Sequence, residues 1–85
     1  MGVEWIMKAL ANRRRLAIIK LLAANGNLTV EQIASHINLS FKATSKHLVI
    51  LGKTNILFSK QVSRNVYYGL VDDIHPIVHT TLTHL

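Results

Sequence analysis

The sequence contains no cysteine, one proline, four glycines and only four acidic residues among its 85 positions. The absence of cysteine excludes disulfides and thiolate metal sites, and it is compatible with a reducing compartment. No apolar run approaches the ~18 residues that span a bilayer, and no leader-like pattern is visible. We therefore expect a cytoplasmic protein with no membrane partner, folded as a single domain over residues 1–85.

Basic residues are plentiful where acids are scarce. Ten lysines and arginines give a net charge of +6 and a pI of about 10.2. This balance favours a polyanionic partner, nucleic acid first and an anionic membrane surface second. Apolar residues make up 49% of the chain, which is high for so small a domain and favours an apolar face covered by a second chain.

Capping signals divide the first two thirds of the chain into four helices. Asn12 and Ser40 are suited to cap the helices that follow them, and Thr29 precedes Gln32 by the three residues of a capping box. Gly26 lies where the second helix should stop. The predicted helices cover residues 3–11, 13–25, 29–37 and 40–54.

After Asn55, which can adopt the left-handed conformation that ends a helix, the pattern changes. Two β-rich runs flank the polar segment 60–64 and predict a hairpin. Asp72 and Asp73 are expected to open a last helix, with Pro76 in its first turn, where the missing N–H does no harm. These strands and the last helix cover residues 56–59, 65–70 and 74–84. The sequence thus predicts a mainly α domain with a small β-hairpin, a winged helix-turn-helix.

The fourth predicted helix, about 40–54, has two different faces. Ala43, Leu48 and Leu51 are expected to point inward, with His47 beside them. The residues expected to point outward near its start are Phe41, Lys42, Ser45 and Lys46. Lysine reaches guanine acceptors or phosphates, serine bonds to either, and phenylalanine packs on a thymine methyl. We therefore predict that this helix reads double-stranded DNA in the major groove.

The hairpin, the predicted wing over about 56–70, carries a second basic group. Lys60 and Arg64 are expected to contact phosphates or a minor groove beside the same helix. Lysines on a helix are often only solvated, and a loop is polar in any case. The combination of helix and hairpin, and neither alone, therefore favours DNA. A winged helix used only for contact with another protein remains the alternative.

Three segments together resemble the ArsR/SmtB family of bacterial winged-helix repressors. They are KALANRRRLAIIKLL, LTVEQIASHINLSFKATSKHLVIL and NVYYGL, which extend over nearly the whole chain. The resemblance implies a transcriptional regulator, expected to be a repressor, that reads a palindromic operator as a homodimer. Its reading residues would be those already named on the fourth helix, with Arg64 as the wing arginine. His47 and Arg15 match positions that are structural in the family.

The family's dimer interface consists of the first and last helices. Short terminal helices cannot bury all their apolar residues within one small core. The residues we expect at the dimer interface are Trp5, Ile74, Ile77, Val78 and Leu82.

Many members of this family sense metals, so the ligands were compared one by one. One family site uses cysteines on the third helix, and this sequence has none there. A second uses an Asp-x-His pair on the last helix, which Asp73 and His75 match, but the pair that completes it is missing. His75 and His79 lie one turn apart and would hold a metal only weakly. We predict no metal and no cofactor, with a last-helix metal sensor as the alternative.

Two further classes are less favoured. For an enzyme, Ser45 and His47 would have to cooperate, but they lie two apart on a helix and face different sides, with no acid to orient the histidine. For a membrane-surface protein, the basic amphipathic run RRRLAIIKLLAA would be the anchor. Its apolar face is equally explained by a winged-helix core. The arginines that open it, residues 13–15, would either touch phosphate or pair with acids elsewhere.

Overall fold

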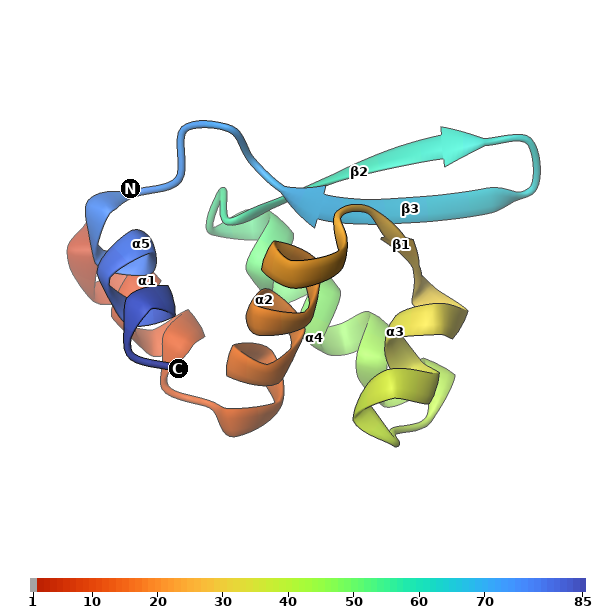
Figure 1. Ribbon diagram of the computed structural model, residues 1–85, viewed down its shortest axis with the longest axis horizontal. Helices are drawn as coiled ribbons and strands as arrows, with labels where there is room; N and C mark the ends of the chain where they lie inside the picture. The colour runs from red at the N-terminus through yellow and green to blue at the C-terminus, as the bar shows by residue number, and fades with distance from the viewer. Residues whose placement is uncertain (1) are drawn as a thin grey trace.

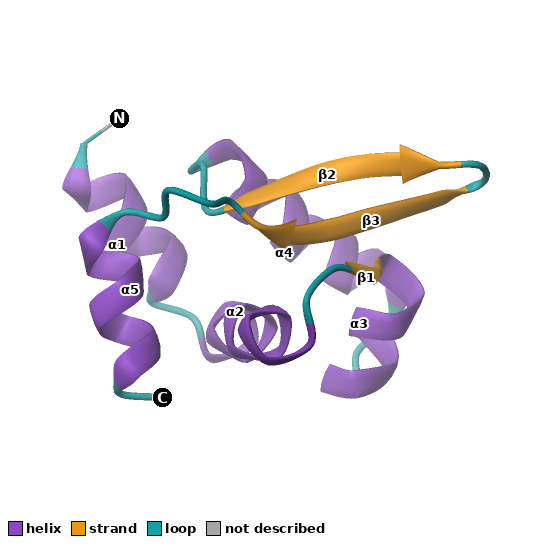
Figure 2. Cartoon of the chain, turned by 45° about the horizontal axis from the view of Figure 1, so that its top comes forward, coloured by secondary structure: helices purple, strands orange, loops and turns teal. Residues whose placement is uncertain are grey.

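The computed structural model describes residues 2–85, and it confirms the predicted winged helix-turn-helix (Figure 1). The helices are α1 (Val3–Leu10), α2 (Arg13–Asn25), α3 (Val30–Ile37), α4 (Phe41–Lys53) and α5 (Pro76–Thr83), and the strands are β1 (Leu28–Thr29), β2 (Leu57–Val62) and β3 (Asn65–Leu70). α1 and α5 lie side by side at one end, α2 lies in the middle, and the β2–β3 hairpin projects beyond the other end (Figures 1 and 2). Within residues 2–85, no helix is long and apolar enough to cross a membrane.

The caps of α2, α3 and α4 form as predicted. The Asn12 side chain accepts hydrogen bonds from the first backbone N–H groups of α2, and Ser40 accepts one from Ala43 in α4. Thr29 and Gln32 form the reciprocal bonds of a capping box at the start of α3. These bonds satisfy N–H groups that have no partner within the helix. They set where each helix begins, and so they place the tight turn between α3 and α4.

The sheet has three antiparallel strands in the order β1-β3-β2, one more than predicted. Leu28 and Thr29 pair with Tyr68 and Tyr67 of β3, and a two-residue strand has too little sequence to be recognised without that partner. Gly69 lets the side chains of Asn27 and Phe58 lie close against the backbone of β3, because a Cβ at this position would collide with both. The sheet therefore ties the wing to the start of α3.

The hairpin is longer and its turn tighter than predicted. β2 continues to Val62, which pairs with Asn65, so only Ser63 and Arg64 form the turn. Lys60 consequently lies within β2, opposite Tyr67, and the prediction that it belongs to the connecting loop is wrong. Polar residues on both strands extend the ladder because each backbone group that pairs with the opposite strand is satisfied whatever its side chain.

The last helix begins later than predicted. Residues before a proline are disfavoured in the helical conformation, and His75 accordingly has an extended ψ of 142° and caps α5 through its own side chain. Asp72, Asp73 and Ile74 therefore lie outside the helix, and the prediction that the two acids open it is wrong.

One cluster of apolar residues fills the space between the helices and the sheet. Its fully buried members include Ile18, Ile19, Ile33, Leu48, Leu51, Ile56 and Val78. On α4, Thr44 is also fully buried, in the inward position that had been predicted for Ala43. Thr44, Leu48 and Leu51 follow helical spacing, so Thr44 occupies a core position of α4. The sequence did not reveal this position because threonine is a polar residue type. The Thr44 hydroxyl has no hydrogen-bond partner among residues 2–85.

Candidate nucleic-acid interface

The start of α4 is held in place by the turn that precedes it. Asn38 ends α3 in the left-handed conformation, with φ of 55° and ψ of 52°. The N–H of Leu39 then bonds back to the carbonyl of Ala34 at 3.0 Å, and Ser40 caps α4. A left-handed residue followed at once by a cap turns the chain within three residues. The first turn of α4 therefore projects from the domain at a defined angle.

The outer face of α4, defined here as Phe41, Lys42, Ser45, Lys46, Val49 and Ile50, lines a shallow groove. Lys42 and Lys46 are exposed, Ser45 is half-buried, and Phe41 is 56% exposed although it is strongly apolar. An exposed phenylalanine beside two lysines suits a surface that contacts both phosphates and base edges. The structure thus brings the four predicted reading residues together on one face.

The wing meets this face through Arg64. Arg64, Phe41 and Glu31 line one small cleft between the hairpin turn, the start of α4 and α3. Lys60 does not line it and lies further along β2. The two predicted wing residues are therefore not equivalent, because only Arg64 lies next to the start of the predicted reading helix.

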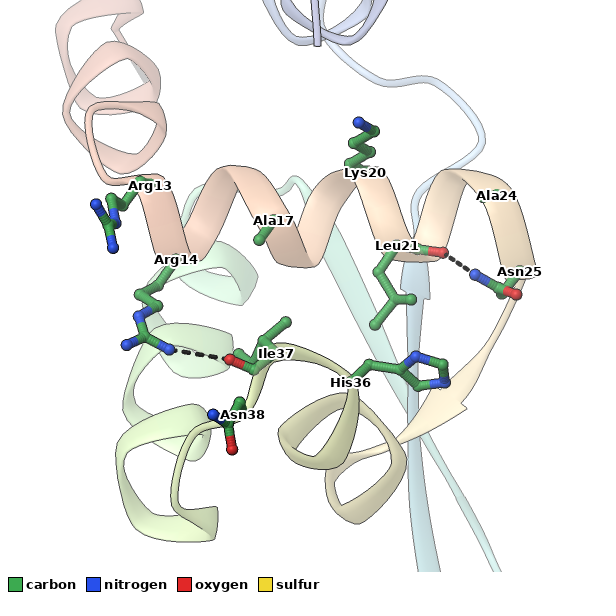
Figure 3. A pocket seen from close by; sticks show the side chains of 10 residues that line it. All are labelled: Arg13, Arg14, Ala17, Lys20, Leu21, Ala24, Asn25, His36, Ile37 and Asn38. Carbon is green, nitrogen blue, oxygen red and sulfur yellow. Dashed lines mark hydrogen bonds between the residues drawn. The ribbon is translucent and has the colours of Figure 1, made fainter.

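The arginines at the start of α2 have different surroundings. Nε of Arg15 donates to the carbonyl of Ala9 at 2.6 Å, and its Nη2 donates to the carbonyl of Lys8 at 3.1 Å. Nη1 of Arg14 donates to the carbonyl of Ile37 at 3.0 Å (Figure 3). Each arginine thus caps the C-terminus of another helix, α1 or α3, where the last carbonyls lack partners and the dipole favours a cation. Acidic partners were one of the two alternatives for these arginines; Arg14 and Arg15 bond to backbone carbonyls instead, and Arg13 remains exposed.

His47 links α4 to this arrangement. Its Nδ1 accepts a hydrogen bond from Nη1 of Arg15 at 3.3 Å, since arginine can only donate. Burial, followed by the positive charges of Arg15 and Arg14, lowers the pKa of His47 from its ordinary value of 6.5. The neutral imidazole therefore acts as an acceptor that connects the back of α4 to α2. This agrees with the structural role that the resemblance implied.

The residues predicted at a dimer interface occupy three environments. Val78 is 0% exposed and packs in the core of its own chain, which leaves it no surface for a partner. Ile74, Ile77 and Leu82 are half-buried against that core and keep part of their surface free. Trp5 is 62% exposed and lies in a groove beside α4.

The histidines of the last helix do not gather into a metal site in the described chain. Nδ1 of His75 accepts a hydrogen bond from the N–H of Ile77, so this nitrogen serves as a helix cap. Within residues 2–85 no group of three or more histidine, aspartate or glutamate side chains is placed to hold a metal ion.

Comparison with known proteins places this geometry in a family. The profile described as "Bacterial regulatory protein, arsR family" matches residues 12–57, the helix-turn-helix and the segments on either side. The transcriptional activator HlyU of Vibrio cholerae is 35% identical over 65 residues, which cover 76% of this chain but only 59% of HlyU. The transcriptional repressor SdpR of Bacillus subtilis is 32% identical over 65 residues, covering 76% of this chain and 71% of SdpR.

A solved structure extends the similarity to the wing and the terminal helices. The homodimeric winged helix-turn-helix DNA-binding domain from Mycobacterium bovis superposes with a TM-score of 0.84 at 28% identity, covering 96% of this chain and 73% of that one. The profile, the relatives and the solved structure all describe transcriptional regulators or DNA-binding domains, and none of these proteins is described as an enzyme. The chain therefore belongs to the ArsR family of bacterial regulatory proteins, transcriptional regulators built on a winged helix-turn-helix.

Proposed function

We propose that this protein binds double-stranded DNA sequence-specifically, with α4 in the major groove and the wing on the phosphate backbone. The observation that carries the proposal is the outer face of α4, where Lys42 and Lys46 line one groove with the exposed ring of Phe41, and Phe41 shares a second cleft with Arg64 of the wing. Lysines there reach guanine acceptors, and the ring packs on a thymine methyl. Arg64 and, further along β2, Lys60 neutralise phosphates.

The protein acts as a homodimer on a palindromic operator. α1 and α5 lie side by side, and they leave apolar surface uncovered at Met7, which is 56% exposed, and at the half-buried Ile77 and Leu82. The solved relative from M. bovis is described as homodimeric, which supports the same arrangement here. Two α4 helices related by a two-fold axis would read half-sites about 34 Å apart. Sedimentation at micromolar concentration should give about twice the monomer mass.

DNA binding by this protein leads to repression and needs no metal. SdpR is described as a repressor, although HlyU is described as an activator, so the direction of regulation requires its own measurement. A bound dimer blocks polymerase where its site overlaps a promoter, and transcription in vitro from such a template should fall. Adding zinc or a chelator should leave operator affinity unchanged. A ten-fold loss at micromolar free zinc that His75→Ala abolishes would instead establish a metal sensor.

The deciding experiment is the selection of bound sequences from random duplex DNA. We expect enrichment of an inverted repeat and an affinity that falls steeply with salt, because each neutralised phosphate releases a counterion. The double variant Lys42→Ala/Lys46→Ala is the matched control, and it should enrich no sequence. If the unmodified protein enriches nothing and binds no duplex at low salt, the winged helix serves contact with another protein.

A further inference from the structure

A second groove lies at the other end of α4, between α1, the start of α2 and the last turn of α4. Trp5 and Ile50 give it a mostly apolar lining, and Lys8, Arg15 and Lys53 surround it with positive charge. Its volume of about 710 Å³ falls within the ~300–1,000 Å³ of small-molecule sites. We infer that this groove binds a small amphipathic organic anion, an aromatic or short aliphatic body that carries one carboxylate.

The charges around the groove select the anionic end of such a ligand. No acidic side chain lines the groove, so the three cations there are not neutralised within it. Arg15 is held by the carbonyls of Ala9 and Lys8 and provides a fixed positive charge, while Lys8 and Lys53 are exposed and free to move toward a carboxylate. A charge-assisted hydrogen bond from a lysine is stronger than a neutral one.

The apolar lining selects the other end of the ligand. Trp5 is the single tryptophan of the chain, and its side chain is 62% exposed beside Ile50, which is 39% exposed. The hydroxyl of Thr54, at the edge of the groove, already donates to the carbonyls of Ile50 and Leu51 and does not demand a polar partner. An apolar body that covers Trp5 and Ile50 removes both from water.

Two larger occupants fit this groove less well. A DNA backbone offers phosphates but no apolar group to cover Trp5. A second copy of this chain has a net charge of +6 and only four acids, so it opposes the three cations of the groove. Trp5 also lies two residues from Met7 on α1, which places the two side chains about 200° apart around the helix. We therefore assign Met7 to the partner protomer and Trp5 to the ligand, in place of the dimer interface at which the sequence predicts Trp5.

Ile50 connects this groove to the proposed reading face. It lines both the groove beside Lys46 and the groove beside Trp5, and it lies four residues after Lys46 on the same side of α4. A bound anion would also cancel positive charge that attracts DNA. We therefore expect the ligand to weaken DNA binding. This effect rests on the proposed function, whereas binding of the anion does not.

The test uses the full chain without DNA and follows the fluorescence of Trp5. Phenylbutanoate is the probe, and phenylbutanamide is its neutral counterpart of nearly the same shape. We expect saturable quenching or a shift by phenylbutanoate, with roughly ten-fold weaker binding of the amide, since a charged hydrogen-bond partner contributes about that factor. Equal affinities for the two compounds, or unchanged emission up to millimolar phenylbutanoate, would overturn the inference.

Three variants locate the site. Lys8→Gln and Lys53→Gln should each reduce the preference for the anion, because each removes one cation of the groove. Lys20→Gln is the matched control, since Lys20 is an exposed lysine of α2 that lines a different groove (Figure 3) and should leave the preference intact. An equal loss in all three variants would mean that only the net charge matters, and the inference would fail.

A last measurement separates the ligand from a second copy of the chain. The emission of Trp5 without ligand should stay constant as the protein is diluted, and Trp5→Ala should sediment like the unmodified protein. If dilution shifts the emission and Trp5→Ala is monomeric, a second copy covers the groove and the inference is wrong. Because no DNA is present, failure here leaves the proposed function untouched, and failure to bind DNA leaves these results unchanged.

Discussion

The basic residues that open α2 and those that open α4 are similar in number and differ in what they contact. Arg14 and Arg15 donate to carbonyls at the ends of α3 and α1, whereas Lys42 and Lys46 extend from an exposed helix face. Both groups contribute to the net charge that suggested a nucleic-acid partner. The difference teaches that the charge of a segment does not locate an interface. An interface is located by which cations lack a hydrogen-bond partner inside the fold.

The largest expected effect is loss of stability when Arg15 is truncated. Arg15→Ala leaves the carbonyl of Ala9 and the ring of His47 without their donor, so the free energy of unfolding should fall by roughly 2–3 kcal/mol. Urea denaturation measures this. Arg13→Ala, two residues away on the same helix and exposed, should stay within about 0.5 kcal/mol of the unmodified protein. Similar losses for both variants would remove the distinction between structural and free arginines.

The next effect concerns base reading by α4. Lys42→Ala or Lys46→Ala should cost roughly 1–3 kcal/mol of binding free energy on the selected operator wherever a bidentate base contact is lost. Affinity for random duplex should change much less, and thermal stability should not change, because both side chains are exposed. Quantitative binding to operator variants checks this. If operator and random DNA lose affinity equally, the lysines contact phosphate only and α4 is not the reader.

The wing should behave differently from α4. Arg64→Ala should weaken binding to every sequence by a similar factor, and the slope of log affinity against log salt should decrease by about one, as expected for one lost phosphate contact. Arg64→Lys preserves the charge and should retain the slope. A change in sequence preference, with an unaltered slope, would assign Arg64 to base reading and not to phosphate contact.

The smallest expected effect is a pH dependence through His47. Its pKa is lowered in the folded protein, so between that value and the ordinary 6.5 the unfolded chain binds the proton more readily. The stability from the neutral ring is therefore complete above pH 6.5 and is lost as the pH falls through the window below it. Denaturation of His47→Gln at several pH values should show a weaker pH dependence than the unmodified protein. An unchanged pH dependence would assign the titration to other histidines.

Local bonding explains why the helices of the helix-turn-helix could be predicted so well. Asn12, Thr29 and Ser40 cap the helices directly after them, through bonds that span two or three residues. Such bonds depend only on the residue types along a short stretch of chain. The outward placement of Phe41 and Lys42 then follows from helical periodicity.

The misplaced elements depended on partners far away in the sequence. β1 exists only because Leu28 and Thr29 pair with the tyrosines of β3, and β2 extends to Val62 because β3 supplies the opposite strand. Val78 was assigned to the surface of the last helix, but it is 0% exposed in the core. Val78 lies on the same apolar stripe of α5 as Ile77 and Leu82, and the packing of α5 against α1 and the core decides which part of that stripe is fully buried.

By itself, the sequence determined the starts of α2, α3 and α4, the order of the helices and of the hairpin, the positive charge and the family to which the chain belongs. These depend on capping bonds, side-chain period and residue type, all of which act over a few neighbouring positions. The tertiary structure alone decided which cations are free. Arg15 finds its partners six, seven and 32 residues away, and Arg14 finds its partner 23 residues away. Only the folded chain brings such groups together, because the packing of α1, α3 and α4 around α2 sets those distances.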